Sequence, residues 1–389
     1  MTKGKVWPSE MSVYHDRFTN VKITQLTDYK AHSHHLYFTE NGWYHNQKKV
    51  LFISDRNNAT NLFSLHIETG EITQLTDFAT ASYFSVCLHP FEDKAYFRLR
   101  NELYEIDLNT LEERLLFTGN PELNGGNINC TADGRFLITS LSEDFSDRIL
   151  LDLGNGYVGH EELMDARPKS QVIQVDIETG EMNVLFEEDN FITHINTSPT
   201  QKHLITFCHE GPWHLVDHRI WGLNIETGEV WKIRERTEER ELVGHEYWCE
   251  DGETVGYHGF RADGTGFIGK IKYDNTELEE EEFEFVNWHA FSNDFSRVVV
   301  DGRDALEKLI VWEKKDGVFS KPKVLCEHRC SFHSQKVHAH PRFTPDQKQI
   351  LFTSDRNGYG NLYVVDVPDD FSELSDLNEE PTKYTYHLD

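Results

Sequence analysis

Residues 51–76 read LFISDRNNATNLFSLHIETGEITQLT, and versions of this stretch recur along the chain. Apolar and polar positions alternate on either side of turns rich in Asn, Asp and Gly, which is typical of antiparallel hairpins. The other copies are LFTSDRNGYGNLYVVD at 351–366, VIQVDIETGEMNVLF at 172–186, LNIETGEVWKI at 223–233 and LYEIDLNTLEERLLF at 103–117. The stretch therefore predicts a β-protein built from repeated hairpins.

A second phrase precedes each copy: a short strand, a turn containing Pro, Asp or Gly, and an apolar strand, as in FTPDQKQILF at 343–352. Together the two phrases give four antiparallel strands per unit. Seven such units begin near residues 32, 82, 126, 192, 243, 287 and 338. Four strands at this period are typical of a propeller blade. The predicted fold is an all-β, seven-bladed β-propeller that occupies residues 1–389 as a single domain.

The N-terminal segment predicts how the last blade ends. Residues 21–28 (VKITQLTD) nearly duplicate residues 71–78 (EITQLTDF), although no blade has begun at that point of the chain. A free sheet edge invites pairing with another chain, so natural proteins cover such edges. We therefore expect this N-terminal strand to close the last blade at its outer edge.

The composition limits the possible partners. The chain carries 38 Lys and Arg against 67 Asp and Glu, a formal charge of −29. Nucleic-acid binding needs clustered basic side chains, so no nucleic-acid partner is expected. The same charge repels long polyanions, whereas local cations can hold a short acidic ligand. No apolar run suits a membrane helix or a secretory signal, and the six cysteines are scattered. These features predict a cytoplasmic protein with no membrane partner.

Five of the seven predicted blades carry a histidine at the same place in the repeat, five residues before the Pro or acidic residue that follows the first strand. These residues are His35, His194, His245, His289 and His340. The place is the start of the innermost strand, and in a propeller these starts surround one mouth of the central channel. We expect the imidazoles to converge there, with a polar ring around a water-filled channel as the alternative.

The densest segment is QKVHAH at 335–340. In an extended strand, residues two apart point to the same face, so His338 and His340 can reach one ion. Gln335 can add its amide oxygen, and His289 of the preceding blade a third imidazole. This donor set, with open positions, suits manganese, iron, zinc or nickel. A competing zinc-like group consists of Cys326, His328, Cys330 and His333, in a spacing that fits no standard zinc knuckle.

Two family resemblances follow from these segments. The phrase SDRN…LY…D…TGE…LT resembles the TolB-like propeller repeat, which implies a fold and no particular function. More specific motifs resemble the oligogalacturonate lyases of pectin breakdown: CHEGP at 208–212, VDHRIW at 216–221, HEYW at 245–248, WHAFSN at 288–293 and QKVHAHP at 335–341, with WPSE at 7–10 and SVYHD at 12–16. This second resemblance spans nearly the whole chain and is weakest in residues 80–170.

The resemblance to oligogalacturonate lyases implies roles for particular residues. It implies a manganese-type ion on His289, Gln335, His338 and His340, with His245 as the catalytic base and Arg219 as a partner of the substrate or transition state. We expect His209, His194 and His34 to bind the substrate at the same mouth. The chain departs from the family pattern at His218 and Ala339, where the family usually has Ala and Pro, and in the segment after His34.

These residues fit β-elimination from a uronic acid, which removes the proton at C5 beside the carboxylate and expels the group at C4. A metal ion on the carboxylate stabilises the enolate-like intermediate, and a neutral imidazole can take the proton. The predicted function is an oligogalacturonate lyase acting on di- and trigalacturonides. It would give products of the 4-deoxy-5-ketouronate type in pectin catabolism, as a monomer or weak homodimer.

Alternatives stay open from the sequence. The chain could be a metal-dependent lyase or hydrolase for another short uronic-acid oligosaccharide, or a non-catalytic TolB-like binding propeller. Arg219 could instead form a salt bridge with Asp217 or a neighbouring blade, and His245 could be a fourth metal ligand or line the channel. Three tryptophans could stack on sugars or pack the blades: Trp213, Trp248 and Trp288.

Overall fold

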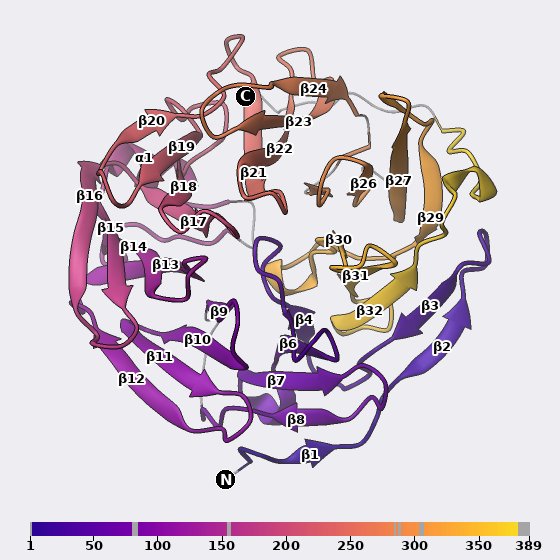
Figure 1. The fold of residues 1–389 in the computed structure, drawn as a ribbon, viewed down its shortest axis with the longest axis horizontal. Helices are drawn as coiled ribbons and strands as arrows, with labels where there is room; N and C mark the ends of the chain where they lie inside the picture. The colour runs from indigo at the N-terminus through magenta and orange to yellow at the C-terminus, as the bar shows by residue number, and fades with distance from the viewer. Residues whose placement is uncertain are drawn as a thin grey trace. The chain divides into compact units, whose positions relative to one another are not determined.

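The structure is a computed structural model that describes residues 2–79, 85–153, 157–283, 285–286, 289–302 and 307–379. Nearly all of its regular elements are β-strands, and within the described residues these strands form seven sheets (Figure 1). The chain divides into two compact units. The first comprises Met1–Ser82, Asp263–Ile268 and Glu281–Asp389, and the second comprises Tyr83–Ala262 and Gly269–Glu280.

The first unit holds the sheets of the first, sixth and last repeats. The first sheet contains β1 (Val6–Trp7), β4 (Ser33–His35), β5 (Trp43–Tyr44), β6 (Lys49–Ser54), β7 (Asn61–His66) and β8 (Ile72–Gln74). The sixth contains β25 (Ala290–Phe291), β26 (Arg297–Val300), β27 (Lys308–Lys315), β28 (Val318–Phe319) and β29 (Lys323–Glu327). The last contains β2 (Ser12–His15), β3 (Lys22–Gln25), β30 (Arg342–Phe343), β31 (Gln349–Ser354) and β32 (Asn361–Asp366). The short 3-10 helices are η1 (Arg56–Asn58), η2 (Gln335–Val337) and η3 (Phe371–Glu373).

The second unit holds the next three sheets of the chain. The first of them contains β9 (Val86–Leu88), β10 (Lys94–Leu99), β11 (Glu102–Asp107) and β12 (Glu113–Thr118). The second contains β13 (Leu123–Cys130), β14 (Phe136–Glu143), β15 (Lys169–Asp176) and β16 (Met182–Asp189). The third contains β17 (Ile192–Thr197), β18 (Leu204–His209), β19 (Ile220–Asn224) and β20 (Val230–Lys232). The helix α1 (His160–Ala166) lies between β14 and β15. The remaining sheet contains β21 (Leu242–Trp248), β22 (Thr254–Phe260), β23 (Gly266–Lys272) and β24 (Glu279–Glu282).

This pattern confirms the predicted fold class, a seven-bladed β-propeller with four antiparallel strands per blade. Each sheet is built mainly from consecutive strands, because each pair of repeated phrases supplies two hairpins. The prediction that residues 1–389 form one domain stays a prediction. Among the described helices, none has the length and apolar character needed to cross a membrane.

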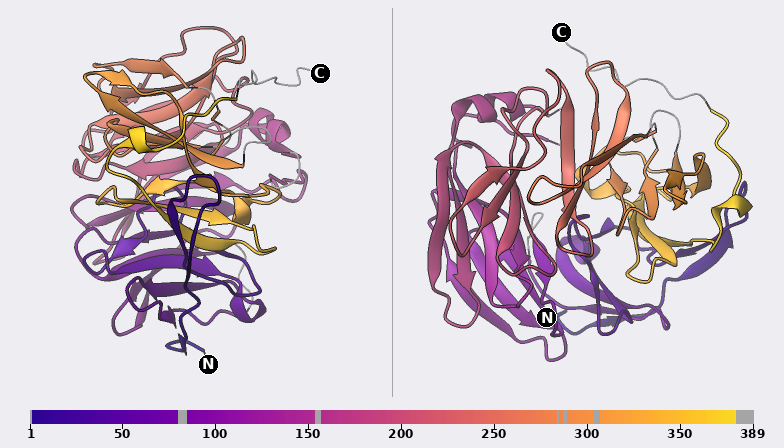
Figure 2. Two further views of the ribbon diagram at one scale, coloured as in Figure 1. Left: turned by 90° about the vertical axis from the view of Figure 1, so that its right-hand side faces the viewer. Right: turned by 45° about the horizontal axis from the view of Figure 1, so that its top comes forward.

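The N-terminal strand closes the last blade, as predicted. In the register of β3 and β32, Ile23 lies opposite Val365 and Gln25 opposite Tyr363. The strand β2 then pairs outside β3, so the indigo start of the chain runs beside its yellow end in Figure 1 and Figure 2. The N-terminus also adds β1 to the outer edge of the first sheet, which the sequence did not predict.

The core explains why the middle strands of the blades are apolar throughout. Five of the six residues of β6 are buried, since this strand is covered on both of its faces. In the first unit, Phe52 and Phe63 pack with Leu351 and Leu362 of the last sheet. Equivalent contacts hold the sheets of the second unit together. Packing of neighbouring sheets therefore accounts for the apolar middle strands of the blades.

In three blades the first, innermost strand contains a β-bulge, which sets the direction of the side chains there. In β17 the extra pair of residues is His194 and Ile195, and in β21 it is His245 and Glu246. The equivalent bulge of β13 begins at Gly126. His194 and His245 have left-handed backbone angles, with φ of 51° and 50°. A bulge breaks the alternation of the strand and re-aims a side chain, so these histidines leave the ordinary pleat.

Candidate functional site

The first unit brings three of the predicted metal ligands together. The ring of His340 lies 5.5 Å from that of His289 and 5.3 Å from that of His338, centroid to centroid. All three side chains are buried. We call these three residues the imidazole cluster. The prediction that His289, although about 50 residues earlier in the chain, approaches the 338–340 segment is confirmed.

The backbone around the imidazole cluster is fixed by neighbours from the same unit. The amide of His289 donates to Asp301 Oδ2 (3.1 Å), and the amide of Asp301 donates to the His289 carbonyl (3.2 Å). The Phe38 ring lies 4.3 Å from the ring of His289 and 5.6 Å from that of His340. Phe332 contacts His338 at 5.7 Å. The imidazoles are thus held against aromatic rings.

The extended-strand geometry expected for residues 338–340 is wrong. His338 follows η2 in an extended conformation (φ −77°, ψ 135°), but His340 is left-handed, with a φ of 37°. Same-face alternation therefore does not apply, and the two rings meet through this backbone turn instead. The bend expected after Gln335 is present as η2, and the Gln335 side chain is exposed.

Burial keeps the imidazole of His338 neutral, because it lowers the pKa of this side chain to about 4. A neutral imidazole is the form that binds a metal ion. His35 lies next to the same segment, with Nε2 3.2 Å from the Ala339 carbonyl and Nδ1 2.6 Å from that of Leu36. The neighbouring His34 is also buried, and burial lowers its pKa to about 4.

The second unit gathers charged side chains around Glu210, which follows β18. Its carboxylate contacts Arg219 Nη1 (3.1 Å), His194 Nε2 (2.9 Å), His160 Nε2 (3.2 Å) and Thr193 Oγ1 (2.9 Å). Burial would raise the pKa of Glu210, but Arg219 and the two histidines outweigh it and hold this pKa well below its usual range. Glu210 is therefore ionised. We call Glu210 with Arg219, His194 and His160 the Glu210 cluster.

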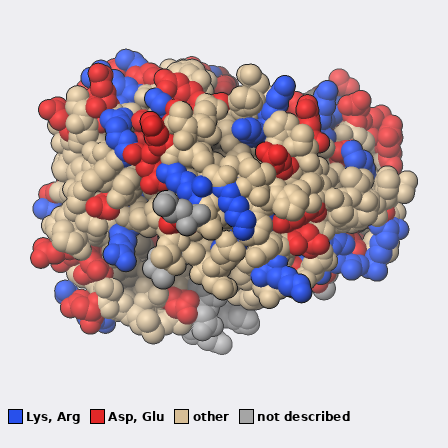
Figure 3. Space-filling model, turned by 90° about the horizontal axis from the view of Figure 1, so that it is seen from below, with Lys and Arg blue, Asp and Glu red and all other residues tan. Residues whose placement is uncertain are grey.

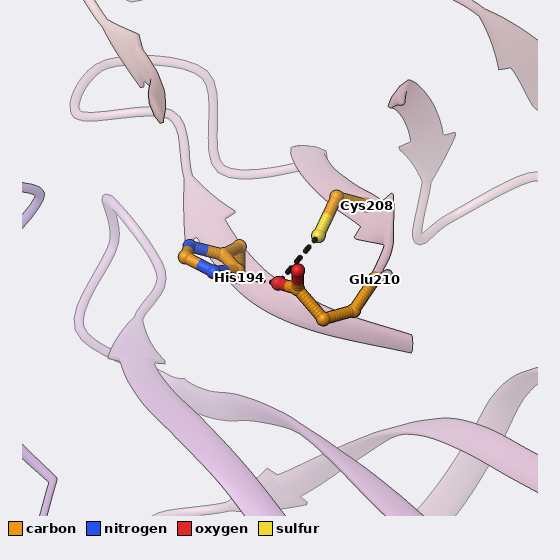
Figure 4. Close-up of side chains that lie close together, drawn as sticks. All are labelled: His194, Cys208 and Glu210. Carbon is orange, nitrogen blue, oxygen red and sulfur yellow. Dashed lines mark hydrogen bonds and ion pairs between the residues drawn. The ribbon is translucent and has the colours of Figure 1, made fainter. Parts of the chain in front are cut away.

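A metal ion does not suit the Glu210 cluster, although three possible ligands meet there. His194, Cys208 and Glu210 have ligand atoms within 4.8 Å of one another, the only such trio in the described part of the chain (Figure 4). The Arg219 guanidinium on the same carboxylate would repel a cation. Burial also raises the pKa of the Cys208 thiol well above its usual value, so the sulfur stays protonated. The imidazole cluster is less compact than this trio.

Arg219 is held by two carboxylates. Besides Glu210, its Nε donates to Glu246 Oε2 at 3.4 Å, and Glu246 is 1 % exposed. The guanidinium also lies 5.6 Å from the centre of the Trp213 ring. The salt bridge considered from the sequence thus exists, with Glu210 and Glu246 as partners in place of Asp217.

His245 forms a pair with a second histidine. Its Nδ1 lies 3.0 Å from Nε2 of His258, which is fully buried. The Trp213 ring packs edge to face with both imidazoles, with centroid distances of 5.2 Å to His245 and 5.7 Å to His258. A Cβ on Gly244 would lie 2.5 Å from the Trp213 ring, so this indole can approach only because position 244 is glycine. Trp213 therefore contacts both His245 and Arg219.

His209, predicted to bind substrate, is held between two carboxylates. Its Nδ1 lies 2.6 Å from Asp217 Oδ1 and its Nε2 lies 2.5 Å from Glu188 Oε1. Burial alone would lower the pKa of His209, but hydrogen bonds to Asp217 and Glu188 outweigh it and raise this pKa. Both ring nitrogens are thus occupied by the protein.

The remaining residues that the sequence singled out are two tryptophans and the zinc-like group. The Trp248 indole donates to the Asn196 carbonyl (3.0 Å) and so serves packing between β21 and β17. Trp288 lies outside the described residues. His328 Nε2 faces the Asp301 carbonyl at 2.9 Å and Cys330 donates to Val337, so the zinc-like group is used in local hydrogen bonds.

Sequence reasoning missed the groups that surround the predicted histidines. These are His160, Glu210, Glu246 and His258. Glu210 and Glu246 stand directly after His209 and His245 in the quoted motifs, which was the available signal. His160 lies on α1, in the weakly matching part of the chain, and reaches Glu210 from there.

Comparison with known proteins gives a consistent result. Residues 1–307 and 309–371 match the family model described as oligogalacturonate lyase. The oligogalacturonide lyase of Pectobacterium atrosepticum is 30% identical over 398 residues, which cover 95% of this chain and 99% of that protein. A solved oligogalacturonate lyase in complex with manganese has a TM-score of 0.86 at 30% identity, covering 95% and 99% of the two chains. An oligogalacturonate lyase from Vibrio parahaemolyticus has a TM-score of 0.85 at 30% identity, covering 95% and 100%.

Proposed function

The chain belongs to the oligogalacturonate lyase family, and we propose that it cleaves galacturonides of two or three sugars by β-elimination. The proton leaves C5, the C4–oxygen bond breaks, and the products are of the 4-deoxy-5-ketouronate type. The observation that carries the residue assignments is the placing of His245 and Arg219 against one indole, that of Trp213. Proton abstraction beside a carboxylate needs a base and a nearby positive charge.

His245 is the base in this proposal. An imidazole can accept a proton at Nε2 only if its other proton sits on Nδ1. His258 Nε2, at 3.0 Å from His245 Nδ1, can accept that Nδ1–H and so hold His245 in the required tautomer. Because His258 is fully buried and packed against Trp213, it can orient the His245 ring in the way that an aspartate orients histidine in a catalytic triad.

Arg219 supplies positive charge to the substrate or transition state. Its two carboxylate partners, Glu210 and Glu246, hold the guanidinium in one position, which lowers the cost of orienting it during the reaction. His194 shares Glu210 with Arg219 and sits in the bulge of β17, from which it can bind a substrate hydroxyl. His34 is assigned to a supporting substrate contact, and His209 would contact the substrate only by giving up its bond to Asp217 or Glu188.

The imidazole cluster is the metal site of the proposal. The buried imidazoles of His289, His338 and His340 fit a divalent ion in their donor chemistry, and Gln335 can add an amide oxygen. Manganese is favoured, because a solved relative at 30% identity is a manganese complex. Such an ion, when bound, acts as a Lewis acid on the uronate carboxylate.

The charge of the chain favours a short substrate. Asp and Glu side chains are spread over the face in Figure 3, with Lys and Arg in small groups between them. A net charge of −29 would repel a long pectate chain, whereas a di- or trisaccharide needs only local cations. The proposal places the reaction in the cytoplasm, on imported fragments, with the enzyme as a monomer or weak homodimer. The scattered cysteines support that compartment.

The test is an assay of the purified protein on digalacturonate, following absorbance of the unsaturated product. We expect turnover that is lost on chelation and restored by manganese. Saturated reducing sugars as the products would show a hydrolase instead. Absence of turnover on di- and trigalacturonate with every tested divalent ion would refute the proposal.

A further inference from the structure

Arg98 differs from the other deeply buried arginines among the described residues. The others are Arg56, Arg219 and Arg234, which bind the carboxylates of Glu10, Glu210 and Glu241 respectively. Arg98 lies on β10 and is 6 % exposed, yet it has no carboxylate partner in the described chain. In a protein with 67 acidic side chains, a buried arginine without a carboxylate partner in the described chain points to a functional role.

The guanidinium of Arg98 is only partly satisfied by hydrogen bonds. Its Nε donates to the Gly126 carbonyl (3.1 Å) and its Nη2 donates to Thr139 Oγ1 (2.5 Å). Its Nη1 has no hydrogen-bond partner within the part of the chain that the structure describes. Burial lowers the pKa of Arg98 to about 10, so the group stays charged at neutral pH. A buried charge without a counter-ion is costly, and an anion from outside the chain would relieve that cost.

Arg98 donates to the carbonyl of Gly126 in the bulge of β13, which is equivalent to the bulges that present His194 and His245. These strands are neighbours: Thr197 of β17 donates to Asn129 of β13 (3.0 Å), and Asn196 of β17 donates to the carbonyl of Glu246 in β21 (3.1 Å). The β13 bulge has glycine where β17 and β21 have histidine.

Gly125, the residue just before that bulge, makes room for the guanidinium. A Cβ on Gly125 would lie 1.8 Å from Arg98 Nη1, so any other residue there would displace the arginine. The cation from β10 therefore lies beside the third bulge, in the row that begins with His245 and His194.

We propose that Arg98 at the β13 bulge is a subsite for a ligand carboxylate, which, on the proposed function, belongs to the sugar next to the one that reacts. A carboxylate can accept a charge-assisted hydrogen bond from a guanidinium Nη1–H, and a galacturonide carries a carboxylate on every sugar. Thr139 fixes the Nη2 side of the fork, which leaves Nη1 for the ligand. Entry of the carboxylate requires a rotamer change, the commonest adjustment of a protein on binding.

The test compares Arg98→Met with the parent protein. We expect the KM for digalacturonate to rise roughly 10- to 100-fold, the loss of one charged hydrogen-bonded contact, with a smaller change in kcat. Methyl-esterifying the carboxylate of the non-reacting sugar should raise the KM of the parent protein similarly and leave that of Arg98→Met unchanged. Equal effects of the ester on both proteins would overturn the proposal.

A matched control separates binding from structural support. Arg234→Met removes an arginine of similar burial that has carboxylate partners, and should lower the melting temperature without raising KM. Arg98→Met should keep or raise the melting temperature of the ligand-free protein, because it removes an uncompensated charge. If the melting temperature of Arg98→Met falls as far as that of Arg234→Met while the KM is unchanged, Arg98 has a structural role and not a binding role. If Arg98→Met does not fold, the same KM comparison is made with Arg98→Lys, which keeps the positive charge but loses the guanidinium geometry.

Failure of the proposed function can be distinguished from failure of the carboxylate subsite. If the parent protein turns over no galacturonide, the lyase assignment falls, and the subsite is tested by thermal stabilisation with galacturonate alone. Stabilisation of the parent protein that is lost in Arg98→Met supports the carboxylate subsite. Equal stabilisation of both, or of neither, overturns it.

Discussion

The imidazole cluster of the first unit and the Glu210 cluster of the second use the same residue type in opposite ways. His289, His338 and His340 lie among aromatic rings, and burial keeps His338 neutral. His194 and His160 instead bind an ionised carboxylate that also holds Arg219. Buried imidazoles packed against aromatic rings suit a metal ion, whereas the imidazoles on Glu210 share an ionised carboxylate with an arginine. The neighbours, rather than the repeat position, decide the role of each histidine.

The largest expected effect comes from removing one member of the imidazole cluster. His338→Ala should lower kcat roughly 10³-fold or more, because a Lewis acid contributes several kcal/mol to the transition state. Elemental analysis of the purified variant should show that bound metal is lost with activity. His328→Gln is the control, since His328 is another buried histidine with a pKa lowered to about 4 but faces the Asp301 carbonyl. A His338→Ala protein with full metal content would break the comparison.

A mutation of the proposed base should separate activity from metal binding. His245→Ala should lower kcat about 10²- to 10⁴-fold, the usual contribution of a general base, while metal content stays normal. His258→Asn should cost less and should move the acidic limb of the pH–rate profile, because His258 only orients His245. Normal turnover by His245→Ala would remove it as the base, and metal loss would make it a ligand.

The Glu210 cluster can be tested through stability. Glu210→Gln leaves Arg219 buried with one carboxylate fewer, so the free energy of unfolding should fall by about 3 kcal/mol in urea titrations. Asp217→Asn is a suitable control, because the Asp217 side chain is 58% exposed and its ion pair with His209 is screened by solvent. If both variants unfold at the same urea concentration, Glu210 is not the centre of a buried charge cluster.

The smallest expected effect is a pH dependence at His209. The pKa of His209 is raised in the folded protein, so its stabilising contribution is complete below the unfolded pKa of about 6.5 and is lost as the pH rises through the folded pKa. His209→Gln should therefore lower the melting temperature in mildly acidic buffer, and the difference from the parent protein should shrink on the alkaline side. A difference that grows with pH would contradict this sign.

Much of the fold could be predicted because it depends on local pattern. The alternating strands around each SDRN or TGE turn fix the hairpins, and the copy of an outer-strand sequence at 21–28 predicts the pairing of β3 with β32. The approach of His289 to His340 was also predictable, since both stand at the start of an inner strand. The left-handed φ of His340 was not, because alternation along a strand carries no sign of a backbone turn.

The sequence by itself determined the blade repeat and the positions of the histidines in it, because strand period and turn chemistry act over a few residues. Only the tertiary structure decided which histidines meet carboxylates, which meets a second histidine, and which bulge receives an arginine from another strand. Those choices depend on bulges and on side chains that come from different sheets, so no short-range pattern in the chain encodes them.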